Sequence, residues 1–334
     1  GNKMKNVKKI ISAALITLLA TSLIGCNMIE KTPEGIAKTE VAKVYNTKIT
    51  KGEVAEQLTG VIKELQTQYG TNYTTNNEAM TALTTQKQQV LAGLIDEKII
   101  NYKAKELKVV PTDATLNTEI NKQLAEVKKS VGTDAAYKAA LTQAGITEEQ
   151  LKARIKPSVV QEALKAETTK NVKVTDAEVK AYYNANLSLY TTKPNTIHLA
   201  HILVKTQDEA VAIKKRLDAG ENFAKLAKEK GTDGTKATGG ELGTLKFNDT
   251  TMDATFMAAA IKVPAGKVST PVQTQYGFHL IKDIARTNYP VKKFADAKAE
   301  IEKTLLAKKK ATAWTAAMTK WTTEANVTKI DKNL

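Results

Sequence analysis

Thr196–Val204 reads TIHLAHILV and Tyr276–Ile281 reads YGFHLI, and the rest of the 334-residue chain is organised around these two stretches. The first is apolar and rich in β-branched side chains, and Pro194 before it disfavours a helix, so it predicts a β-strand. The second contains a glycine at its start and predicts another strand. The three histidines of the chain all lie in these stretches, at His198, His201 and His279. This confinement to two predicted strands raises the question of whether the histidines serve a function.

Between the strands lies a loop, Gly231–Gly243, with the sequence GTDGTKATGGELG. Its glycines supply a permissive backbone around Asp233. They are too scattered for a phosphate-binding loop, and no lysine of the Walker type follows them. We therefore do not expect the loop to bind a nucleotide.

Three pieces of this segment together resemble the parvulin family of peptidyl-prolyl isomerases. They are His201–Val204, the loop from Asp233 to Gly243, and Thr274–His279, and they occur in the family's order between about residues 193 and 286. The resemblance implies a polar cluster of His201, Asp233, Thr274 and His279. It also implies an apolar cup for proline formed by Leu242, Met252, Phe256 and Tyr276. The sequence departs from the family around Met252, because the spacing from Leu242 is slightly longer and a common proline is lost.

Such a cluster suits prolyl isomerisation, which faces a barrier of about 18–20 kcal/mol because the planar amide is resonance-stabilised. The reaction needs no nucleophile, metal or cofactor, and we expect none. An anion at Asp233 would disfavour the resonance form that places negative charge on the prolyl oxygen. Because side chains alternate along a strand, His198 and His201 should face opposite ways. His201 is the one that matches the family motif, so His198 should be a bystander. Two buried core histidines are the competing interpretation of His201 and His279.

The N-terminal residues resemble a bacterial lipoprotein signal. A basic stretch, Met4–Lys9, precedes an apolar run, and that run ends in Leu-Ile-Gly-Cys at Cys26. The resemblance implies a signal peptide at 1–25, a diacylated Cys26 that anchors the protein to the membrane, and a tether at 26–37. A plain signal peptide with an accidental cysteine is the alternative. Cys26 is the only cysteine, so disulfides and thiolate chemistry are excluded.

The flanks of the isomerase-like segment are mainly helical. Capping-box spacings at Thr50, Thr147 and Thr175 predict helix starts, and helices are expected near 50–69, 78–107, 112–130, 134–144, 148–170 and 175–187. A C-terminal helix reaching Ala325 carries an apolar stripe of Phe294, Ile301, Leu305, Trp314, Met318 and Trp321. This stripe needs a partner, and the N-terminal helices are available. Val327–Ile330 could also pair with Val41–Tyr45.

These observations predict an α+β fold in which a parvulin domain at 191–287 is inserted into a discontinuous, mainly helical chaperone domain at 38–190 and 288–334. The helical flanks resemble the SurA and PrsA types of chaperone, and the whole chain resembles the foldase lipoproteins of the PrsA type. The resemblance implies isomerisation of X–Pro bonds in unfolded secreted proteins, on the extracytoplasmic face of a Gram-positive cell membrane. A non-catalytic holdase with a vestigial parvulin domain is the main alternative. A solute-binding lipoprotein is disfavoured, because repeated strand–helix units are missing.

The formal charge of +15 carries information about partners. It is consistent either with an ordinary solvated surface or with attraction to an anionic cell-wall polymer or acidic lipid. The sequence shows no basic patch interleaved with aromatic residues, so we do not expect nucleic-acid binding. A homodimer is compatible with the sequence. The residues between Val204 and about Asp208 are too few for the arginine-bearing loop of phospho-specific parvulins, so phosphoserine-proline recognition is not expected.

Overall fold

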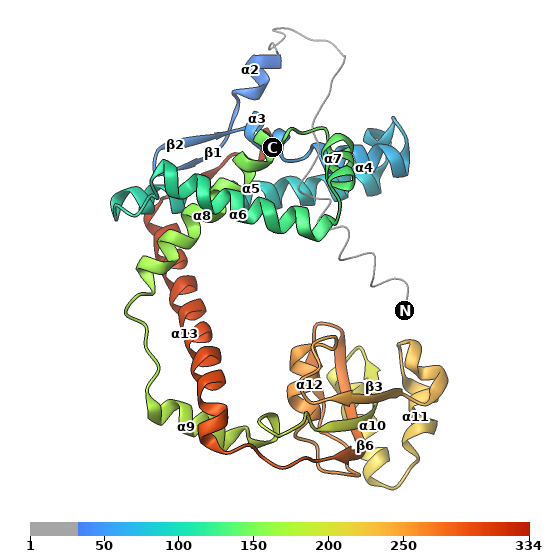
Figure 1. The fold of residues 1–334 in the computed structure, drawn as a ribbon. Coiled ribbons are helices and arrows are strands. Elements are labelled where there is room, and N and C mark those ends of the chain that lie inside the picture. The colour runs from blue at the N-terminus through green and yellow to red at the C-terminus, as the bar shows by residue number, and fades with distance from the viewer. Residues whose placement is uncertain (1–32) are drawn as a thin grey trace. The chain divides into compact units, whose positions relative to one another are not determined.

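The computed structural model describes residues 33–334, which form two compact units (Figure 1). The first unit comprises the described residues up to Val172 together with Lys309–Leu334, and the second comprises Lys173–Lys308. The predicted α+β fold with an inserted domain is therefore confirmed. The predicted signal peptide and Cys26 lie outside the described residues. Of the predicted tether, Pro33–Ala37 form a short helix, α2.

A small sheet in the first unit joins the two ends of the described chain. It consists of β1 (Glu40–Val44), β2 (Thr47–Thr50) and β7 (Thr328–Lys329), in the order β2-β1-β7. The turn between β1 and β2 uses two residues with positive φ, Tyr45 and Asn46, as tight hairpins require. β7 pairs antiparallel with β1, opposite Ala42 and Lys43. The predicted pairing of the C-terminal residues with the first strand is confirmed.

The remaining first unit is helical (Figure 1). Its helices are α3 (Lys51–Glu56), α4 (Thr59–Tyr69), α5 (Asn77–Glu106), α6 (Asp113–Val131), α7 (Asp134–Ala144) and α8 (Glu148–Thr168), with the short 3₁₀ turn η1 at Tyr73–Thr75. Capping boxes start α3 and α8 as the spacings predict. The helix predicted over 50–69 is wrong in one respect, since it breaks at Gln57 and Leu58. There the bonds tighten to three-residue spacing, and Leu58 turns into the core.

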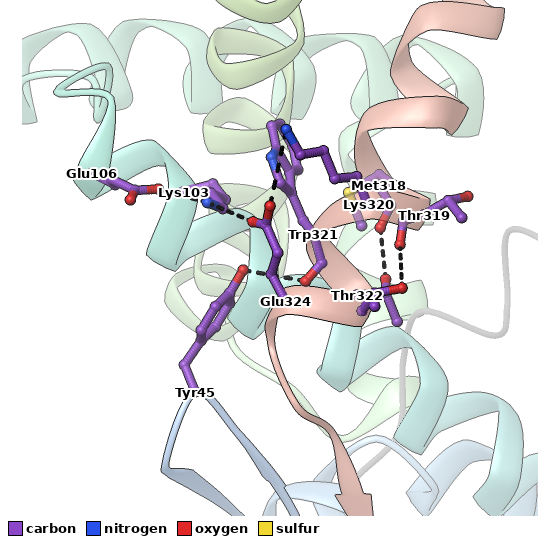
Figure 2. A network of polar contacts seen from close by, with 10 residues as sticks. Tyr45, Lys103, Glu106, Met318, Thr319, Lys320, Trp321, Thr322 and Glu324 are labelled. Atoms are coloured by element: carbon purple, nitrogen blue, oxygen red, sulfur yellow. Dashed lines mark hydrogen bonds and ion pairs between the residues drawn. The ribbon is translucent and has the colours of Figure 1, made fainter.

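The C-terminal half of α13 (Phe294–Glu324) completes the core of the first unit. Trp321 and Ala325 are buried there, and the rings of Trp314 and Trp321 meet edge to face at 5.8 Å. Figure 2 shows the polar contacts that fasten this end: the Tyr45 hydroxyl donates to the Trp321 carbonyl at 3.3 Å, and Lys103 pairs with Glu324 at 3.1 Å. The 3₁₀ turn η4 (Asp331–Asn333) follows β7.

The second unit is built on a four-stranded antiparallel sheet with the order β4-β3-β6-β5. The strands are β3 (Thr196–Val204), β4 (Glu241–Lys246), β5 (Val272–Thr274) and β6 (Gly277–Thr287). Helices α10 (Gln207–Asp218) and α11 (Phe223–Lys230) cover one face, packing on Ile202 and Leu280. Helix α12 (Ala254–Ala260) covers the other, packing on Leu199 and Ile281. The alternation along β3 thus sends its odd-numbered side chains toward α12.

The boundaries of the second unit differ from those predicted. Residues 173–190 and 288–308, which we expected in the chaperone domain, belong to the second unit. Helix α9 (Asp176–Ala185), the 3₁₀ turn η2 (Leu187–Leu189) and Tyr190 pack against the first half of α13. The physical reason is that the apolar stripe of α13 is divided: Phe294, Ile301 and Leu305 contact α9 and Tyr190, whereas Trp314, Met318 and Trp321 contact the first unit.

Candidate active site

The pairing of β3 with β6 brings two histidines together. His201 lies opposite Ile281 and His279 lies opposite Leu203, so the two histidines are diagonal neighbours on the same face of the sheet. Both are buried, and their Nδ1 atoms are 3.0 Å apart. The rings are stacked with centroids 5.2 Å apart. The strand register therefore creates the centre of the site.

The loop after α11 places Asp233 beside His201. The backbone N–H and the hydroxyl of Thr232 both donate to the Leu203 carbonyl, at 3.0 and 2.8 Å, and tie the loop to the end of β3. Asp233 Oδ2 then lies 2.8 Å from His201 Nε2. After Asp233 comes a short 3₁₀ helix, η3 (Gly234–Thr238).

Gly240 closes this loop against His201. The His201 N–H donates to the Gly240 carbonyl at 2.9 Å, and Gly240 has φ of +84°. A Cβ at this position would lie 2.2 Å from the His201 carbonyl oxygen, which no side chain tolerates. The glycine is thus needed for the close approach of two backbone segments, and not only for its φ.

The β5–β6 hairpin supplies the last polar member. Thr274 pairs with Gly277 across the turn, and its Oγ1 is 2.7 Å from His279 Nε2. The backbone N–H of Tyr276 also donates to this oxygen, at 3.2 Å. The four polar residues predicted from the sequence therefore form one connected chain, Thr274–His279–His201–Asp233. We call it the polar chain.

The environment fixes the charges of two members of the polar chain, His279 and Asp233. Burial, assisted by the neighbouring His201, lowers the pKa of His279 to about 4, so this imidazole is neutral at neutral pH. Burial acts to raise the pKa of Asp233, but hydrogen bonds from Thr235 and His201 outweigh it and hold this pKa below its usual value. Asp233 is accordingly ionised, while the buried His279 ring carries no charge.

These charges give the hydrogen bonds a direction. An ionised carboxylate only accepts, so His201 donates from Nε2. The neutral His279 ring lies between His201 Nδ1, 3.0 Å from its own Nδ1, and the Thr274 hydroxyl, 2.7 Å from its Nε2. The arrangement concentrates negative charge at the exposed end of an otherwise buried cluster.

The predicted apolar residues lie at different depths. Phe256 is fully buried, and its ring centroid lies 5.1 Å from that of His279 and 5.7 Å from that of His201. Its ring therefore packs edge to face against both histidines. Leu242 and Met252 are partly buried on the same core. Tyr276 is 65% exposed at the tip of the hairpin. Their proposed contact with proline remains a prediction.

His198 is separate from the polar chain. It is partly exposed and hydrogen-bonds Glu241 on the neighbouring strand β4. The odd-numbered residues of β3, such as Leu199, pack toward α12, whereas the even-numbered residues, such as Ile202, pack toward α10 and α11. The geometry thus gives His198 the bystander position expected from the alternation of side chains.

The sequence interpretation missed one polar neighbour. The Thr235 hydroxyl donates to Asp233 Oδ1 at 2.6 Å, which occupies the carboxylate oxygen that His201 leaves free. An Asp-x-Thr spacing at the start of a turn is a signal for such a local bond and could have revealed it. Among residues 33–334, no cluster of three or more His, Cys, Asp or Glu side chains is arranged to hold a metal ion. None of the helices in that range has the length and apolar character needed to cross a bilayer.

Comparisons with known proteins agree with this architecture. The SurA-like N-terminal domain family matches residues 2–165, and the PPIC-type PPIase domain family matches residues 174–299. The latter range is close to the second unit and wider than the predicted 191–287. Foldase protein PrsA of Clostridium acetobutylicum is 43% identical over 332 residues, covering 99% of this chain and 100% of that protein.

Other relatives show the same pattern. Foldase protein PrsA of Clostridium botulinum is 41% identical over 335 residues, covering 99% of this chain and all of the relative. A crystal structure of the peptidylprolyl isomerase PrsA from Bacillus anthracis matches 71% of this chain and 97% of its own, with 27% identity and a TM-score of 0.42. Family membership therefore rests on the sequence relatives, which match along the whole chain.

Proposed function

The chain belongs to the PrsA family of foldase proteins, and on that premise we propose that its second unit catalyses cis/trans isomerisation of X–Pro bonds in unfolded, exported proteins. One observation carries the proposal: the polar chain from Thr274 to Asp233 is fully connected and lies above the buried ring of Phe256. Two satisfied core histidines would not require an ionised, partly exposed carboxylate at the end of the chain. That carboxylate is the feature that favours chemistry over packing alone.

The proposed mechanism uses charge and shape. In the twisted amide of the transition state, the resonance form with negative charge on the carbonyl oxygen of the X–Pro bond is lost. An anion near that oxygen therefore destabilises the planar ground state more than the transition state. Asp233 supplies the anion, and Leu242, Met252 and Tyr276 contact the proline ring. A thousandfold acceleration requires about 4 kcal/mol of such differential stabilisation.

The connection after β3 supports an unphosphorylated substrate. β3 ends at Val204 and α10 begins at Gln207, so only Lys205 and Thr206 lie between them. This leaves no room for an additional loop that could clamp a phosphate. Thr206 instead caps α10 by accepting from Glu209 N–H.

The test is Asp233→Ala in the full-length protein. We expect isomerisation of an unphosphorylated X–Pro peptide to fall tenfold or more, equivalent to about 1.4 kcal/mol of barrier, with little change in stability because Asp233 holds no core together. Exchange NMR on the peptide gives the rate, and thermal unfolding gives the stability. Wild-type protein without activity would instead support the non-catalytic holdase.

For the first unit we propose a client-binding role that does not depend on the isomerase. The observation that favours it is an open hollow of about 420 Å³ on α13, lined by Trp314 and Met318 together with Thr315, Thr319, Thr322 and Thr323. Apolar side chains rimmed by hydroxyls suit an unfolded segment of mixed sequence. Suppression of aggregation of a client without slow prolines should survive Asp233→Ala. Loss of both activities in the folded variant would show that this division of roles is mistaken.

We further propose that diacylated Cys26 anchors the protein at the extracytoplasmic face of the membrane, because two acyl chains give the stable attachment that one chain does not. In cells, Cys26→Ser should move the protein out of the membrane fraction or leave it uncleaved. Unchanged fractionation together with unchanged mobility would contradict the anchor.

The net positive charge also makes an anionic cell-wall polymer a proposed partner, and binding that weakens with salt would support it. A homodimer remains a proposal that sedimentation tests directly.

A further inference from the structure

The Asp233 carboxylate is held at both of its oxygens. Oδ2 accepts from His201 Nε2 at 2.8 Å, and Oδ1 accepts from the Thr235 hydroxyl at 2.6 Å. Thr235 is itself fixed, because it is half-buried in η3 and its carbonyl accepts the Gly240 N–H at 2.8 Å. The hydroxyl therefore reaches the carboxylate from a rigid position.

This second contact matters because Asp233 stands at the edge of the protein. Its side chain is 29% exposed, whereas that of His201 is 5% exposed. A carboxylate with a single hydrogen bond to an imidazole is free to rotate about that bond, and each rotation moves the charge relative to the prolyl oxygen. A displacement of this kind is costly in catalysis, since positioning alone supplies much of the rate.

We propose that Thr235 is a positioning residue of the isomerase site, whose hydroxyl holds the Asp233 carboxylate in the orientation that binds His201. The inference rests on the proposed function, because it assigns Thr235 a role in the same reaction. It goes beyond that function by extending the polar chain to a fifth member, outside the cluster that the sequence indicated. Thr235 acts through Asp233 and makes no contact with the substrate in this proposal.

The electrostatic setting supports the assignment. Hydrogen bonds from Thr235 are, after the opposing effect of burial, the largest influence on the pKa of Asp233, and they lower it. His201 is the titratable group in contact with the carboxylate, and His279 contacts His201 on its other side. The charge of Asp253 acts to raise the pKa of His279. The charged residues of the adjoining elements are Lys236 on η3, Lys225, Lys228, Glu229 and Lys230 on α11, and Glu241 and Lys246 on β4. Glu229 and Glu241 are paired with Arg216 and His198.

A purely structural role for Thr235 makes different predictions. The loop is held by backbone bonds, above all Gly240 N–H to the Thr235 carbonyl, and valine preserves these bonds and the side-chain shape. Thr238 provides a matched control on the same short helix, because its hydroxyl donates to the Thr235 carbonyl and not to the carboxylate. Thr235→Val therefore removes the hydroxyl contact with the Asp233 carboxylate and little else.

The experiment compares full-length wild type, Thr235→Val, Thr235→Ser and Thr238→Val, with exchange NMR on an unphosphorylated X–Pro peptide as a function of pH. Thr235→Val should lower kcat/KM at pH 7 about threefold or more. It should also move the acid limb of the profile to higher pH, because the carboxylate loses a donor that favours its charged form. Thr235→Ser should restore both, and Thr238→Val should behave as wild type.

Several outcomes would overturn the inference. They are unchanged activity in Thr235→Val, a loss that is the same at every pH, or no recovery in a folded Thr235→Ser protein. The imidazole ¹⁵N signal of His201 Nε2 gives a readout independent of activity, and it should shift in Thr235→Val but not in Thr238→Val. Wild-type protein without isomerase activity would overturn the proposed function, whereas an active wild type that is insensitive to Thr235→Val would overturn this inference alone.

Discussion

At the residue scale, the burial of His279 makes the site sensitive to acid. Its pKa is about 4 in the folded protein and 6.5 for an unperturbed histidine. Between these values the unfolded chain binds a proton that the folded chain does not, so stability should decrease as the pH falls from about 6.5 to about 4. NMR titration of the imidazole should place its midpoint near the lower value.

The matched variant is His279→Asn, which should lose this part of the pH dependence in urea unfolding between pH 7 and pH 5. Other carboxylates titrate in both proteins, so the difference between the two curves isolates His279. A midpoint near 6.5 in the wild type would show that the ring is not buried as described.

Gly240 is the second residue with a specific physical requirement. Gly240→Ala places a Cβ against the His201 carbonyl and demands φ of +84°, so it should lower the free energy of unfolding by more than about 1 kcal/mol and reduce isomerase activity. Gly234→Ala is the control, since nothing lies within 4 Å of its Cβ, and it should change stability by less than about 0.5 kcal/mol. Equal effects of the two substitutions on urea unfolding would contradict the close approach.

At the element scale, β7 covers the edge of β1 and links the C-terminus to the start of the described chain. The Ile330 N–H donates to the Val41 carbonyl at 2.9 Å just beyond the paired residues. Ile330→Pro removes this donor and should cost about 1–3 kcal/mol, because the buried carbonyl of Val41 loses its partner. Urea unfolding of the full-length protein measures the change.

Ile330→Ala is the comparison for this prediction. Ile330 is only partly buried, and alanine keeps the N–H, so the loss should be smaller than with proline. If alanine destabilises the protein as much as proline, the side chain and not the backbone bond holds β7 in place.

At the scale of the whole molecule, each unit depends on different segments of the chain for its stability. The excised segment 173–308 should fold alone with a cooperative thermal transition, because it contains the sheet and both halves of the α9–α13 contact. The shorter segment 191–287 lacks α9 and the start of α13, and it should melt at a lower temperature. Equal stability of the two segments would show that these flanks are not part of the unit.

The first unit should depend on its distant C-terminal segment. A chain of residues 33–172 lacks Trp321 and Ala325, which are buried in the shared core, so it exposes the surface that they cover. Such a fragment should aggregate, and co-expression with 309–334 should reduce the aggregation. A monomeric fragment with native-like stability would contradict the discontinuous core.

The sequence by itself determined the local features of this protein. The extent of β3, the capping boxes at Thr50, Thr147 and Thr175, and the residues of the polar chain all followed from short-range pattern or family motif. Capping and strand alternation depend on a few consecutive residues, so these signals can be recognised in the sequence without knowledge of the fold.

Only the tertiary structure decided which surfaces those elements meet. The stripe on α13 is continuous in sequence, yet Ile301 and Trp321 are buried in different units, because a helix face does not specify its partner. The break at Leu58 likewise depends on neighbours brought in by folding, because this side chain turns into the core. Hydrophobic burial is non-directional, so sequence predicts that a face is covered, while packing and hydrogen-bond geometry determine what covers it.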